Sequence, residues 1–153
     1  MKKYILSILM IFGSLQSYAY LMCNDSLGRN IAYVEKPIGI QAAEANTASN
    51  GTPIIILSLN LYRQLSPAVA EFTNAHECAH HYYGHLTGGM PRNPKHAEFD
   101  ADCFAIKYMR TVGHLKPAEF AQIKQFLGGL IADRSHPSGQ DRVQYALQCA
   151  NTP

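Results

Sequence analysis

The sequence lacks any apolar run long enough to cross a membrane. The run near the N-terminus, from Tyr4 to Leu15, covers about 12 residues, whereas a spanning helix needs about 20. Met1-Lys2-Lys3 precedes this run and Gln16-Ser17-Tyr18-Ala19 follows it. A basic start, a short apolar stretch and small residues before a cleavage site are typical of a secretory signal peptide. We therefore expect residues 1–19 to be removed after Ala19, and the mature chain to have no stable membrane anchor.

The sequence also has little charge and no excess of one sign. Lys and Arg number 13 and Asp and Glu number 11, so the loss of Lys2 and Lys3 leaves 11 basic residues against 11 acidic ones. A near-neutral chain does not attract nucleic acid, and we expect no such partner. Hydrophobic residues make up 47% of the 153 residues, with no repeat and no low-complexity linker. We expect residues 20–153 to form one folded domain.

No two of the four cysteines form a Cys-x-x-Cys pair, which argues against a cysteine-based zinc knuckle. Cys23, Cys78, Cys103 and Cys149 all follow the expected cleavage site. An even number of cysteines in an exported protein favours disulfides, although four small buried thiols are an alternative. We predict two disulfides. Of the three possible pairings we prefer Cys23 with Cys149 and Cys78 with Cys103.

Three short apolar segments in the first half of the chain predict strands. They are residues 31–34, 38–42 and 53–59, of which the last is a run of β-branched and aliphatic side chains. Residues 44–51 are rich in Ala, Asn, Ser and Thr, and this composition predicts a turn.

Four helices are predicted after these strands. Ser66-Pro67 and Asn93-Pro94 each combine an N-cap residue with Pro at the first helical position, and glycines follow as stop signals. A third helix is expected from Pro117 to Gly128. A fourth begins at Ser138, which forms a capping-box pattern with Asp141. Strands followed by helices predict an α+β fold, with a small, mostly antiparallel sheet followed by a helical bundle.

The first long helix contains His76-Glu77-Cys78-Ala79-His80. Residues four apart lie about 40° from each other round a helix, so both imidazoles can meet one ion. Glu77 is close enough to reach a metal-bound water without being a ligand, which predicts a general base. The alternative is a histidine-rich helix that uses its polar face for hydrogen bonds, because His81 and His85 follow closely.

A catalytic zinc site needs three protein ligands and an open fourth position. The metzincin pattern requires Gly and His where this chain has Tyr83 and Leu86, so that class is excluded. In the second helix Glu98 and Asp102 share a face, while Asp100 lies about 200° round from Glu98. We predict Glu98 as the third ligand and Asp102 as the acceptor for a zinc-bound His. A solvated acidic helix face is the alternative.

Three motifs resemble, in the same order, those of the HtpX and CaaX prenyl endopeptidase family of gluzincins and those of the compact minigluzincins. They are residues 76–80 with His85, residues 98–102, and His136-Pro137 with Arg142. Residues 44–48 and the strand ending at Leu59 resemble, more weakly, the Asn-Ala turn and edge strand of that family. The similarity covers about residues 40 to 147. It implies a zincin-like metallopeptidase domain.

The resemblance also implies a role for each matching residue. The family's zinc ligands match His76, His80 and Glu98. Its base matches Glu77, and its supporting acid matches Asp102. His136 is expected near the reaction centre, where it would stabilise the oxyanion. Arg142 is expected to pair with the ligand carboxylate. Because no transmembrane helices surround the domain, prenylated membrane substrates are not implied.

Together these features predict an exported zinc metalloendopeptidase, periplasmic or secreted, that acts on a peptide or protein substrate. Zn²⁺ would activate a water molecule, and Glu77 would take its proton. Residues 54–59 could form the sheet edge that pairs with an extended substrate. Two alternatives are a non-catalytic zinc-containing binding or holding module for exported proteins, and a zinc hydrolase of non-peptide amides. The oligomeric state is not predicted.

Overall fold

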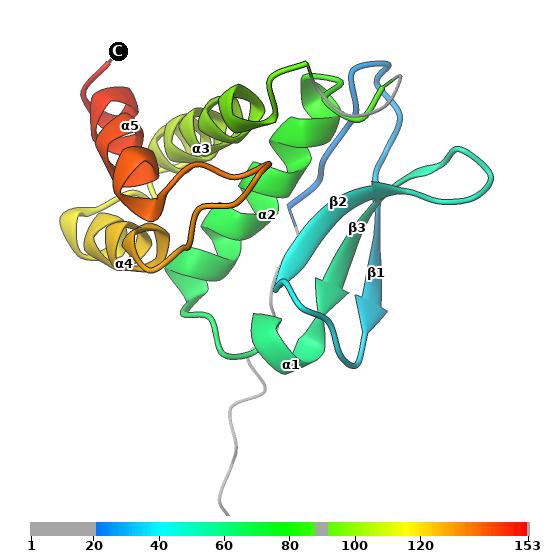
Figure 1. Ribbon diagram of the computed structural model, residues 1–153, viewed down its shortest axis with the longest axis horizontal. Helices are drawn as coiled ribbons and strands as arrows, with labels where there is room; N and C mark the ends of the chain where they lie inside the picture. Colours follow the sequence, from blue (N-terminus) through cyan, green and yellow to red (C-terminus); the bar gives the residue numbers. More distant parts are fainter. Residues whose placement is uncertain (1–20, 88–91, 153) are drawn as a thin grey trace, which may run out of the picture.

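A computed structural model describes residues 21–87 and 92–152, which form an α+β arrangement of a three-stranded sheet and five helices (Figure 1). The expected signal peptide lies outside the described residues. The elements are β1 (Ala32–Lys36), β2 (Ala43–Thr47), β3 (Pro53–Ser58), α1 (Leu59–Tyr62), α2 (Pro67–Tyr82), α3 (Pro94–Thr111), α4 (Pro117–Gly128) and α5 (Gly139–Asn151). No helix in this part of the chain is long and apolar enough to cross a membrane.

The sheet is mixed rather than mostly antiparallel. Its strand order is β1-β3-β2, with β2 antiparallel and β1 parallel to β3. Residues 48–52 close a short hairpin between β2 and β3, whereas residues 37–42 carry the chain from β1 to the opposite side of β3. This crossing passes so close to β3 that a Cβ at Gly39 would overlap the side chain of Ser58. Because the chain reverses once in this crossing and again in the hairpin, β1 and β3 run in the same direction.

The predicted turn at residues 44–51 begins too early, because β2 occupies Ala43–Thr47 and the chain turns only at residues 48–51. The predicted strand at residues 38–42 is wrong, because these residues form the connection from β1 to β2. The side chains of β2 have low strand propensity, and pairing with the apolar strand β3 outweighs that preference. The sheet order also corrects the expectation that residues 54–59 form the edge strand. β3 is the central strand, and β2 is an edge.

The predicted starts of the four long helices are confirmed. The Ser66 hydroxyl accepts a hydrogen bond from the Val69 N–H at the start of α2, and the Asn93 side chain accepts one from the His96 N–H at the start of α3. At α5, the Ser138 hydroxyl also donates to the Asp141 carboxylate. The short helix α1 was not predicted, since four residues carry no helical periodicity.

Helix α2 lies between two apolar cores (Figure 1). Phe72 and Ala75 face the core formed with α3, α4 and α5, whereas Ala70 and Cys78 face the core formed with the sheet and the N-terminal segment. His81 is buried as well and donates its Nε2–H to the Ile54 carbonyl at 2.9 Å, which joins α2 to β3. Helix α2 is therefore packed on both sides.

The chain contains two disulfides, as predicted, but the preferred pairing is wrong. Cys23 pairs with Cys78 and Cys103 pairs with Cys149. Cys78 points from α2 toward the sheet core, where the N-terminal segment lies, so it does not face α3. The first disulfide therefore anchors the N-terminal segment to α2, and the second joins α3 to α5.

Candidate metal centre

Helix α2 presents His76 and His80 on one side, one turn apart. Their Nε2 atoms lie 3.1 Å from each other, and the two rings meet edge to face. Both residues are buried, at 6% and 9% exposure. The helix has no break between them, so the four-residue spacing brings the two nitrogens to a single point, as the sequence predicts.

Glu98 reaches the same point from α3. One carboxylate oxygen lies 3.3 Å from the His76 Nε2, and the other lies 3.3 Å from the His80 Nε2. One donor atom from each of the three residues lies within 4.8 Å of the others. Two imidazole nitrogens and a carboxylate oxygen are a donor set that can hold a metal ion.

The electrostatics of this point favour positive charge. Burial by itself opposes a charge on His76, but hydrogen bonds to Asp102 and Glu98 raise its pKa to about 10. Burial likewise opposes the charge on Glu98, yet hydrogen bonds to His76 and His80 hold the pKa of Glu98 well below its usual range. The two carboxylates that favour a proton here would favour a metal cation for the same reason.

Asp102 and Arg142 support the centre from behind His76. Asp102 is fully buried and lies 2.9 Å from the His76 Nδ1, so it can accept the Nδ1–H and leave Nε2 free to bind a metal. The Arg142 guanidinium donates to both Asp102 oxygens, at 2.6 and 2.8 Å. Its distance to Glu98 is longer, at 3.3 Å. Arg142 thus touches the ligand carboxylate, but its shorter bonds go to Asp102.

Glu77 does not belong to the group of three donors, and its carboxylate contacts the sheet. Its Oε2 accepts a 2.7 Å hydrogen bond from the backbone N–H of Ala45, which lies in the middle of β2. Glu77, His76 and His80 all line the same cleft. The carboxylate is therefore held beside the donor set without belonging to it.

His136 approaches the donor set from the loop between α4 and α5. Its Nε2 lies 4.0 Å from a Glu98 oxygen, and its Nδ1 lies 2.8 Å from Asp133. The Asp133 carboxylate also accepts the backbone N–H groups of Ser135 and His136. The bond to His136, with these two backbone bonds, lowers the pKa of Asp133. Asp133 was not predicted, and its spacing of three from His136 is the only signal in the sequence.

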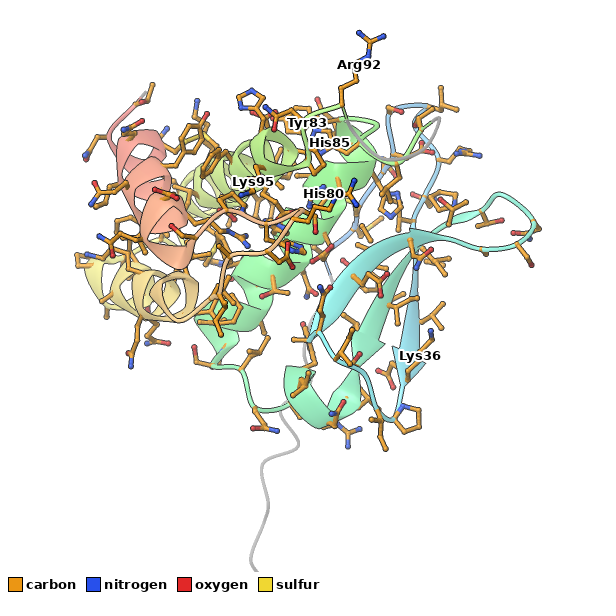
Figure 2. All side chains as sticks on the ribbon, in the orientation of Figure 1. Lys36, His80, Tyr83, His85, Arg92 and Lys95 are labelled. Atoms are coloured by element: carbon orange, nitrogen blue, oxygen red, sulfur yellow. A yellow bond between two sulfur atoms is a disulfide. The ribbon has the colours of Figure 1, made fainter. Side chains whose placement is uncertain are left out.

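His85 also contacts the centre, and the sequence did not determine its role. Its Nδ1 lies 3.1 Å from the His80 Nδ1, and the two rings meet edge to face. Figure 2 shows His85 next to His80 at the end of α2. Burial, and then the neighbouring His80, lower the pKa of His85.

A cleft of about 910 Å³ opens over the centre. It lies between β2 and the connection from α4 to α5, which reaches across α2 toward the sheet (Figure 1). Ile40 and Ile131 line it and are 98% and 89% exposed. The other apolar lining residues include Leu61, Leu65, Phe72, Leu86, Phe126 and Leu130. The three residues that could hold a metal ion thus lie in an open, largely apolar groove.

Comparisons with protein-family models, with curated proteins and with solved structures gave no match.

Proposed function

We propose that this chain is an exported zinc metalloendopeptidase with a zincin-like domain, of the gluzincin type that its motifs resemble. The observation that carries the proposal is the meeting of His76, His80 and Glu98 at one point beside Glu77. A structural zinc site has four protein ligands, whereas a catalytic one has three and leaves a position open. The three donors, with a cleft above them, match the catalytic kind.

The donor set fits Zn²⁺ in particular. His76 and His80 offer Nε2 atoms, Glu98 offers an oxygen, and Asp102 accepts the proton on the opposite nitrogen of His76. When bound, Zn²⁺ supplies Lewis-acid chemistry that acidifies water and polarises a carbonyl group. Side chains of the protein transfer the protons and stabilise the charge that develops on the substrate.

Glu77 is the general base in this mechanism. It takes a proton from the attacking water and delivers it to the leaving amine. Its hydrogen bond to Ala45 fixes the carboxylate at the floor of the cleft. His136, held by Asp133, directs its Nε2 toward the metal ligands and donates to the negative charge that develops on the substrate carbonyl oxygen.

The substrate in this proposal is an extended peptide segment. Neighbouring residues of an edge strand alternate in the direction of their backbone groups. Because the Ala45 N–H reaches Glu77 rather than β3, the backbone of Ala43 and Thr47 also faces the cleft side. A peptide can pair with this edge as an added strand. The exposed Ile40 and Ile131 favour apolar side chains in that peptide.

Export is part of the same proposal. The two disulfides are typical of an oxidising compartment such as the periplasm or the extracellular space. The signal-peptide pattern of residues 1–19 predicts a mature chain that begins at Tyr20. Intact mass of the protein recovered from the periplasm or the medium tests this cleavage.

The deciding experiment compares the mature protein with its Glu77→Gln variant. Both should bind one zinc per chain, because Glu77 is not a ligand. Only the wild type should cleave members of a diverse peptide library. Equal cleavage by the variant would refute the base, and the absence of zinc from both proteins would refute the metal site. A non-catalytic holding module would bind unfolded exported proteins equally well with or without the Glu77→Gln substitution.

A further inference from the structure

We infer that His85 is a positioning residue for the second metal ligand, because it accepts the Nδ1–H of His80 and so keeps the His80 Nε2 free for the metal. The inference rests on the proposed metal site. His85 is neither a proposed metal ligand nor one of the groups that transfer or donate protons in the proposed mechanism. Three observations carry it: the end of α2, the direction of the His80 ring, and the contrast with His76.

The C-terminal turn of α2 brings His85 back over His80. Tyr83 caps the helix, and Gly84 follows with φ of +69°. The Gly84 N–H bonds to the His81 carbonyl at 3.0 Å, and the His85 N–H bonds to the His80 carbonyl at 2.8 Å. This pair of bonds is the Schellman motif, in which the residue after the left-handed one folds onto the last turn.

At the two positions that this motif brings into contact, α2 has imidazole side chains instead of apolar ones. In the Schellman motif the two contacting positions commonly form an apolar contact. Here they are His80 and His85, with ring centroids 5.2 Å apart. The backbone of the helix end therefore holds His85 next to His80 without any contribution from a metal ion. Gly84 is required, because a side chain at positive φ would be strained.

The direction of the His80 ring sets the chemistry of the contact. Its Nε2 faces the His76 Nε2 and a Glu98 oxygen, so its Nδ1 faces away from the metal site. A neutral imidazole that binds a metal through Nε2 carries its proton on Nδ1. This proton points at the His85 Nδ1, which is 3.1 Å away and accepts it with its lone pair. His85 then carries its own proton on Nε2.

The two histidine ligands therefore have different supports. His76 donates to the Asp102 carboxylate, which is fully buried and paired with Arg142. His80 donates to a neutral ring on a partly exposed residue that lines the cleft. A hydrogen bond to an ionised acceptor is about twice as strong as one between neutral groups. His85 thus orients His80 without adding a further negative charge.

The test separates the hydrogen bond from the volume of the ring. His85→Asn places an amide oxygen at the position of Nδ1 and keeps an acceptor, whereas His85→Leu keeps similar bulk and has none. Zinc affinity is measured by competition with a chelator. The Leu variant should bind about 10 to 100-fold more weakly, and the Asn variant should bind almost as tightly as the wild type. His96→Leu changes an exposed histidine on α3 and should leave the affinity unchanged.

A second measurement uses the zinc-loaded protein, in which the metal occupies the His80 Nε2 and the ring proton is on Nδ1. Proton NMR should find this Nδ1–H protected from exchange with water in the wild type and in the Asn variant, and in fast exchange in the Leu variant. Wild-type affinity in the Leu variant, equal loss of affinity in both variants, or an equally protected proton in the Leu variant would overturn the inference. A wild type that binds no zinc would instead refute the proposed function on which the inference rests.

Discussion

The carboxylate of Glu77 and the backbone N–H of Ala45 are joined by a 2.7 Å hydrogen bond across the floor of the cleft. The donor belongs to the edge strand of the sheet and the acceptor to the helix that carries two of the proposed metal ligands. The bond therefore ties the proposed base to the strand that would pair with the substrate. It also shows that the N–H of Ala45 takes no part in the pairing of β2 with β3.

This geometry predicts the effect of removing a single backbone donor. Proline is tolerated on an edge strand where its missing N–H does not belong to the ladder, so Ala45→Pro should preserve the fold and the zinc content. Its kcat should fall roughly 10 to 100-fold, since a hydrogen bond to a charged group contributes about 1.5 to 3 kcal/mol. Ala45→Gly keeps the donor and serves as the control. A Pro variant with the kcat of the Gly variant would contradict the positioning of Glu77 by β2.

Arg142 should stabilise the fold of the metal-free protein, in addition to any effect on metal affinity. Its guanidinium neutralises Asp102, which is fully buried. Arg142→Ala leaves that carboxylate with His76 as its remaining partner, and the loss of one partner of a buried ion pair costs about 3 to 5 kcal/mol. Urea unfolding of the metal-free protein measures the loss. Glu98→Ala should instead lose zinc with a smaller change in the stability of the metal-free chain. The reverse order of stabilities would refute this division of roles.

His136 and Asp133 should act on kcat and leave the metal in place. His136→Ala should retain full zinc and lose roughly 10²-fold in kcat, as expected for a donor to the oxyanion. Asp133→Asn keeps the turn of the loop but weakens the hold on the His136 Nδ1, so its loss of kcat should be smaller. Metal analysis and peptidase kinetics on both variants test the pair. Zinc loss from His136→Ala would move this residue into the ligand set.

The disulfide between Cys103 and Cys149 should stabilise the framework behind the metal. It joins α3, which carries Glu98, to α5, which carries Arg142. Replacing both cysteines with Ala should lower the free energy of unfolding by about 2 to 5 kcal/mol. Urea titrations of the oxidised wild type, the reduced wild type and the double variant measure this. Identical midpoints for the oxidised and reduced wild type would show that neither disulfide contributes.

Ile131 should influence which peptides are cleaved. It is 89% exposed at the rim of the cleft, and Ile38 is 78% exposed but does not line it. Ile131→Asp should lower kcat/KM for apolar peptides by about 10-fold, because one lost apolar contact in a pocket costs roughly 1 to 3 kcal/mol. Ile38→Asp should leave the cleavage profile unchanged. Equal effects of the two substitutions would place the substrate elsewhere.

The parts of the site that the sequence could predict depend on short-range geometry. His76 and His80 share a side of α2 because 3.6 residues make one turn, and Glu98 and Asp102 share a face of α3 for the same reason. The helix starts depend on the same local rules, since Pro67 and Pro94 follow residues that cap the first turn. None of these features requires knowledge of which helices pack together.

Only the tertiary structure decided the relationships between distant segments. Ala43–Thr47 became a strand because β3 offered a partner, and Cys78 paired with Cys23 because that side of α2 packs on the sheet core. Arg142 makes its shortest bonds to Asp102 because α5 packs against α3 beside that carboxylate. Residues far apart in the chain meet only where burial of their apolar faces brings them together, and local periodicity contains no information about that choice.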